Sequence, residues 1–91
     1  MTAEIDPELV DLIESAPVQS ESPVPVIITL EHGIDIDPLV KAGLRIERMA
    51  EAIDAVAGAI PVSRVLELAS VPGVKIIEYD REMHALAAES A

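Results

Sequence analysis

The clearest fold signal in the chain is the stretch from Asp54 to Asp80, which is DAVAGAIPVSRVLELASVPGVKIIEYD. Small and branched apolar residues predict a strand over Ala52 to Ile60. Pro61 then opens a predicted helix. Its core-facing side follows the spacing i, i+3, i+4, i+7 and consists of Val62, Val65, Leu66 and Ala69. The turn Val71-Pro72-Gly73 ends this helix, and a further strand is predicted over Val74 to Tyr79.

Two more strands and a brief helix precede this stretch. The segment from Val24 to Leu30 is rich in β-branched residues and predicts the first strand. Asp37-Pro38 starts a short helix that glycine ends at Gly43. A second strand is marked by Leu44, Ile46 and Met49. The order βαββαβ predicts an α+β fold of the ferredoxin-like, split-βαβ type, with an antiparallel four-stranded sheet and two helices on one face.

Residues 1–23 are expected to lie outside this unit. Asp6-Pro7 combines a helix cap with proline, and Glu8 places an acid at the positive end of the helix dipole. A short helix is therefore predicted over residues 7–14. Residues 15–23 have the Pro- and Ser-rich composition of an extended linker. The chain thus divides into an N-terminal helix and linker (1–23), an α+β domain (24–80) and a C-terminal tail (81–91).

The composition excludes several classes of function. The chain has 91 residues without Cys, Trp or Phe, which removes disulfides, thiolate metal sites and aromatic platforms for single-stranded nucleic acid. Acids outnumber bases 17 to 6, and the formal charge of −11 disfavours nucleic acid and anionic membranes as partners. The N-terminus lacks the features of a secretory signal, so a cytoplasmic location is expected. No cofactor or metal is expected.

The third predicted strand has one face of small residues. Because side chains alternate along a strand, Val56 and Ile60 share one face, and Ala55, Ala57 and Ala59 share the other. If the larger side chains face the helices, the opposite face is apolar but thin, and helices of another protein could approach it closely. The alternative is that the alanines only accommodate close packing within the chain. The strand alone does not decide between these two interpretations.

The order of a small-residue strand, short helix, Pro-Gly turn, acidic strand end and extended peptide resembles a subtilisin propeptide, over about residues 24–86. In that family the open sheet face packs on two surface helices of the protease. Acids at the end of the last strand cap those helices, and the C-terminal peptide occupies the substrate cleft. The resemblance implies that Glu78 and Asp80 are the capping acids. It also implies that the cleft holds Met83, His84, Ala85 and Leu86.

Within the cleft, the resemblance puts Leu86 in the primary specificity pocket and Met83 in an apolar pocket three residues earlier. Two known interactions would stabilise such a complex. Carboxylates are stabilised at helix N-termini, and an extended peptide can form main-chain hydrogen bonds along a cleft. Two alternatives stay open. Glu78 and Asp80 can be ordinary solvated acids, and residues 81–91, which are rich in helix formers, can form a helix in the free chain.

The sequence predicts a binding protein rather than an enzyme. No nucleophile, base and orienting group occur in a recognisable catalytic context. Asp35 and Asp37 lack the ordered spacing of a Ca²⁺ loop, so turn and capping roles are expected for them. Because no protease domain follows, we expect a free-standing inhibitor, and also folding chaperone, of a subtilisin-like serine protease. The alternative is a non-inhibitory interaction or ligand-regulated module on the same fold, and self-association is left open.

Overall fold

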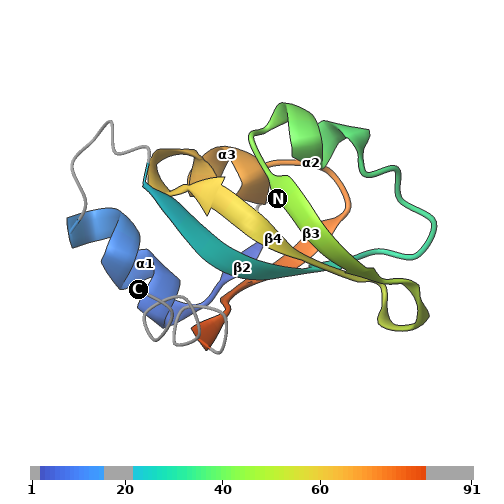
Figure 1. Cartoon of the computed structure of the whole chain (residues 1–91), viewed down its shortest axis with the longest axis horizontal. Helices are drawn as coiled ribbons and strands as arrows, with labels where there is room; N and C mark the ends of the chain where they lie inside the picture. The colour runs from blue at the N-terminus through green and yellow to red at the C-terminus, as the bar shows by residue number, and fades with distance from the viewer. Residues whose placement is uncertain (1–2, 16–21, 82–91) are drawn as a thin grey trace.

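The chain folds into one mixed β-sheet with short α-helices packed against it (Figure 1). The structure is a computed structural model in which residues 3–15 and 22–81 are described. The strands are β1 (Glu4–Ile5), β2 (Pro23–Leu30), β3 (Arg45–Ala50), β4 (Ala55–Pro61) and β5 (Val74–Tyr79). The helices are α1 (Pro7–Ser15), α2 (Asp37–Lys41) and α3 (Val65–Ala69), with 3₁₀ turns η1 (Glu51–Ile53) and η2 (Val62–Arg64).

Among the residues that the structure describes, the sheet has five strands in the order β1-β5-β2-β4-β3. β2 pairs antiparallel with both β4 and β5, and β3 pairs antiparallel with β4. β1 pairs with β5 in parallel. The prediction of a four-stranded, wholly antiparallel sheet is therefore wrong in the number of strands and in the direction of the added one. The α+β class and the four predicted strands are confirmed.

The hydrophobic core lies on one face of the sheet. Alternate residues of the central strands, such as Ile28 of β2 and Ile60 of β4, are fully buried on this face. Each helix adds a fully buried leucine to the same core: Leu9 from α1, Leu39 from α2 and Leu68 from α3. All three helices therefore cover the same side of the sheet. Figure 1 shows α1 at the end of the molecule opposite the β3–β4 turn.

The N-terminal segment is part of this fold rather than an appendage. The helix predicted over residues 7–14 is present as Pro7–Ser15. Just before it, Glu4 and Ile5 pair with Ile76 and Ile77 and extend the sheet beyond β5. The backbone N–H of Ala3 donates to the carbonyl of Ala69, 2.9 Å away. The edge of β5 thus satisfies its main-chain groups with the chain's own N-terminal segment, and the boundary expected at residue 23 separates parts that share one core.

Of the four residues predicted to face the core after β4, Val62, Val65 and Ala69 are buried as predicted, whereas Leu66 is not. Pro61 is the last residue of β4, and the 3₁₀ turn η2 precedes α3. Because a 3₁₀ turn has about three residues per turn, Val65 lies on the same buried side as Val62. Within α3, Leu68 and Ala69 follow Val65 at i+3 and i+4 and are also buried. Leu66, which was predicted to face the core, is 59% exposed. The prediction assumed α-helical periodicity from the first residue onward.

The β3–β4 connection also differs from the prediction. The strand expected over Ala52 to Ile60 begins only at Ala55, because Glu51–Ile53 form the 3₁₀ turn η1. Asp54 follows in the left-handed region, with φ of 51°, and its carbonyl accepts a hydrogen bond from Leu30 N–H at 2.8 Å. Aspartate tolerates this backbone conformation better than most residues with a side chain.

Candidate docking surface

The face of the sheet opposite the helices, here called the outer face, contains the three predicted alanines. Ala55, Ala57 and Ala59 alternate with the buried Val56, Gly58 and Ile60 along β4, as predicted. Strand pairing arranges the outer face in three rows across the sheet. The rows are Arg45-Ala59-Pro25, Arg48-Ala57-Ile27-Glu78 and Ala50-Ala55-Thr29-Ile76. The centre of this face is therefore almost wholly apolar, with charged side chains at its two sides.

Both arginines reach the outer face because β3 contains a bulge. Arg45 and Arg48 are three residues apart, which in a regular strand places them on opposite faces. The pairing shifts between Ile46 and Arg48, so that Glu47 is the extra residue. Arg45 consequently lies opposite Ala59, and Arg48 lies opposite Ala57. The sequence analysis did not identify these arginines, because period-2 alternation cannot reveal a bulge.

A shallow hollow lies on the outer face next to β3. Its walls include Ile27, Ala57 and Arg48, together with Ile53 from η1. Ile53 is 69% exposed, which is high for a side chain of this size and polarity. The helices that form the core lie on the other face of the sheet, so none of them covers this hollow. Such an apolar surface is a candidate contact area for another protein.

The structure separates the two acids at the end of β5. Glu78 is exposed and pairs with Ile27, so it forms the β5 side of the central row. Asp80 is only 7% exposed, and its backbone N–H donates to the carbonyl of Pro25 at 3.0 Å. In this conformation only Glu78 presents its carboxylate to a partner. Four other predicted partner-binding residues lie outside the described residues: Met83, His84, Ala85 and Leu86.

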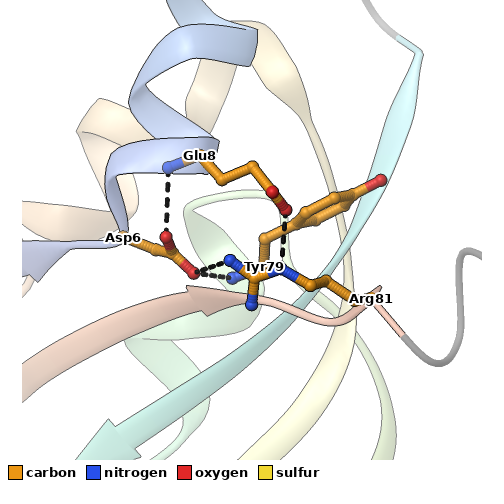
Figure 2. A network of polar contacts seen from close by, with 4 residues as sticks. All are labelled: Asp6, Glu8, Tyr79 and Arg81. Carbon is orange, nitrogen blue, oxygen red and sulfur yellow. Dashed lines mark hydrogen bonds and ion pairs between the residues drawn. The ribbon is translucent and has the colours of Figure 1, made fainter.

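A polar network joins the end of β5 to the start of α1 (Figure 2). Asp6 accepts a hydrogen bond from Glu8 N–H through Oδ1 at 3.0 Å, which confirms its predicted role as helix cap. Its Oδ2 accepts from Tyr79 N–H at 3.3 Å and lies 3.5 Å from the Arg81 guanidinium. Arg81 Nε also lies 2.9 Å from Glu8 Oε2. The network holds the chain against α1 at Arg81, where the tail begins.

This network predicts how the folded protein responds to alkaline pH. Burial raises the pKa of the Tyr79 phenol above its ordinary value of 10.0, the negative charge of Glu8 raises it further, and Arg81 partly opposes both. Above about pH 10 the unfolded chain therefore loses this proton more readily than the folded chain. The free energy of unfolding is expected to fall as the pH rises from that point through the higher pKa of the folded state.

The prediction is simple to measure because the chain has one tyrosine and no tryptophan. The tyrosinate absorbance of the folded protein reports Tyr79 alone, and Glu8→Gln is expected to move its midpoint to lower pH. Tyr79→Phe serves as the control for other groups that titrate in this range, since it removes only the tyrosine part of the pH dependence. A folded-state midpoint at or below that of the urea-unfolded chain would contradict the prediction.

Other polar groups in the described part of the chain give no alternative site. Asp35 Oδ1 accepts a hydrogen bond from Asp37 N–H at 3.1 Å, in keeping with a turn role. His32 Nδ1 lies 3.1 Å from Asp54 Oδ1, with the His32 side chain 92% exposed. Over residues 3–15 and 22–81, no group of three or more His, Asp or Glu side chains is arranged to bind a metal ion. The same residues contain no helix that is long and apolar enough to cross a membrane.

Comparisons with known proteins add no further information about this surface. The chain has no significant match among protein-family models, curated protein sequences or solved structures. A functional proposal therefore depends on the residues of the outer face, the acidic strand end and the sequence of the tail.

Proposed function

We propose that this chain is a protein inhibitor, and a folding chaperone, of a subtilisin-like serine protease. The observation that carries the proposal is the apolar outer face, which the helices of the core do not cover. Its alanines and Ile27 lie at the centre of the sheet, and the exposed Glu78 lies beside Ile27 on β5. Two surface helices of a protease would pack on this face. The proposal assigns no catalytic residue to the chain.

The strand arrangement is compatible with the propeptide fold. Without β1, the order is β5-β2-β4-β3 and every neighbouring pair is antiparallel, with a helix in each of the β2–β3 and β4–β5 connections. We infer that β2 to β5 with α2 and α3 form a ferredoxin-like unit. In this interpretation β1 and α1 are additions at its β5 edge. Fold alone does not assign a function, so the proposal depends on the surface and the tail.

Glu78 is the acid best placed to contact a helix N-terminus of the protease. It is exposed at the side of the outer face, and a carboxylate at a helix N-terminus gains from the unpaired N–H groups and the dipole. Asp80, at 7% exposure, would need to become accessible before it could do the same. We therefore assign the capping contact first to Glu78 and only secondarily to Asp80.

The tail would supply the part of the inhibitor that enters the substrate cleft. The Arg81 contacts with Asp6 and Glu8 attach the start of the tail to α1. From there, Met83 and Leu86 are the apolar side chains spaced for two pockets, with main-chain pairing between them. An attached starting point lowers the conformational entropy lost when the tail orders in a cleft, which favours binding.

Inhibition kinetics against several subtilisin-like proteases test this proposal. Three chains are compared: the full chain, one ending at Leu86 and one ending at Arg81, which keeps the Arg81–Glu8 ion pair. The first two are expected to inhibit, and the third to inhibit at least about 100-fold more weakly, because it has lost both apolar anchors. Within the tail, Leu86→Asp is expected to weaken inhibition, whereas the matched change Ala88→Asp, beyond the expected cleft segment, is not.

Two outcomes would reject the inhibitor hypothesis. One is a full chain that inhibits none of the proteases at concentrations where it is folded. The other is equal inhibition by the chains ending at Leu86 and at Arg81, because the tail would then be dispensable. In the first case the fold would be better explained as a non-inhibitory interaction module.

A further inference from the structure

We propose that the outer face also binds a second copy of this chain, giving a two-fold symmetric dimer in which β2 of each copy lies over β4 of the other. The dimer would bury the surface proposed to dock on the protease, so dimer and protease complex would exclude each other. That competition rests on the proposed function, but the dimer itself does not. The inference follows from the order of residues in the central row.

The central row is polar at both ends with opposite charges. Across the sheet it consists of Arg48 on β3, Ala57 on β4, Ile27 on β2 and Glu78 on β5. With neighbouring strands about 4.8 Å apart, the row extends over about 14 Å. Within the described residues, neither Arg48 nor Glu78 has an ion pair, and both are exposed. The central row of each copy therefore offers one unpaired positive and one unpaired negative charge, one on each side of an apolar centre.

A two-fold axis parallel to the strands, passing between β2 and β4, makes this row complementary to itself. Rotation about that axis exchanges β2 with β4 and β5 with β3, while it keeps each row at its own height along the strands. Arg48 of one copy then lies over Glu78 of the other, twice per dimer. An axis perpendicular to the strands within the interface would instead bring β3 over β3, with arginine against arginine. The charges therefore select the first arrangement.

The same axis also matches large side chains with small ones. Ile27 of one copy lies over Ala57 of the other, near the hollow that Ile27, Ala57 and Arg48 line. In the neighbouring rows, Pro25 lies over Ala59 and Thr29 lies over Ala55. Sheets packed face to face commonly keep their strands within about 30° of each other, which this axis allows. Large-over-small contacts permit close packing without overlap of side chains.

The formal charge of −11 on each copy works against association. Salt at about 0.15 M reduces this long-range repulsion, whereas contacts at the centre of the interface are screened less. Sedimentation equilibrium of the full chain at this ionic strength is therefore the direct test. A species of twice the 9.7 kDa chain mass is expected to increase with protein concentration.

Charge-exchange variants test the arrangement within the dimer. Arg48→Glu and Glu78→Arg are each expected to weaken dimerisation about tenfold or more, because each change affects two symmetry-related contacts. The double variant re-forms both pairs with reversed signs and is expected to recover most of the lost affinity. Lys41→Glu on α2 and Glu14→Arg on α1 change the net charge equally, are exposed and lie away from the outer face. They are expected to leave the row contacts intact.

A chain that remains monomeric up to about 1 mM would overturn the proposal. So would single variants that weaken the dimer no more than their helix-face controls, or a double variant that recovers nothing. Ala57→Glu provides a test that does not depend on the ion pairs, since its charge falls at the apolar centre and is expected to abolish the dimer. A chain that dimerises as described but inhibits no protease would leave this inference standing and reject only the inhibitor hypothesis.

Discussion

Leu9→Ala is expected to lower the free energy of unfolding by about 2–5 kcal/mol, the range for removing a fully buried leucine side chain. Leu9 of α1 is 0% exposed and belongs to the core cluster formed by the sheet and the other helices. For a 91-residue chain this loss is a large part of the total stability. Urea unfolding followed by circular dichroism measures it.

Leu66→Ala is the matched control for this change. Leu66 also lies in an α-helix, but it is 59% exposed, and leucine and alanine have similar helix propensities. Its replacement is expected to change the free energy of unfolding by less than about 0.5 kcal/mol. Equal losses for the two variants would show that α1 is not packed into the core or that Leu66 is not exposed.

Gly58→Ala is expected to destabilise the protein by about 3 kcal/mol, at the upper end of the range for overpacking. A Cβ atom at this position would clash with the carbonyl oxygen of Arg45, which is backbone and cannot rotate away. To relieve the clash, β3 must move away from β4. The bulge at Glu47 is then expected to change, and with it the positions of Arg45 and Arg48 on the outer face.

Gly33→Ala separates this steric effect from backbone strain. Gly33 has φ of 79°, and a Cβ there would meet no atom within 4 Å. The expected cost is therefore only that of placing alanine in the left-handed region, about 1 kcal/mol. Gly58 has no such positive φ, so its predicted cost comes from contact with β3 alone. If Gly58→Ala lowers the free energy of unfolding no more than Gly33→Ala does, β3 does not approach Gly58 closely.

Local pattern was sufficient to predict strands β2 to β5 and the two faces of β4. The alternation around Val56, Gly58 and Ile60 correctly separated the buried face of β4 from the alanine face. Proline and glycine signals placed α2 and the start of β5. These predictions succeeded because each depends on side chains only a few residues apart, whose directions the strand or helix geometry sets.

Other features could not be predicted because their cause lies far away in the chain. Two residues, Glu4 and Ile5, are too few to show any periodicity, and they become a strand only because the edge of β5 offers free main-chain groups. The Leu66 error has a similar origin. The end of β4 at Pro61 and the 3₁₀ turn after it set the phase of α3, and both depend on the sheet to which they attach.

The amino-acid sequence by itself determined the α+β class, the apolar outer face of β4 and the acidic character of the strand end, because hydrophobic alternation and composition are properties of short segments. Only the tertiary structure decided that α1 packs into the core, that Asp80 is buried while Glu78 is exposed, and that Arg48 and Glu78 end the same row. The physical reason is that strand register and a single bulge place residues from four separate strands side by side, and pairing over such distances leaves no local pattern.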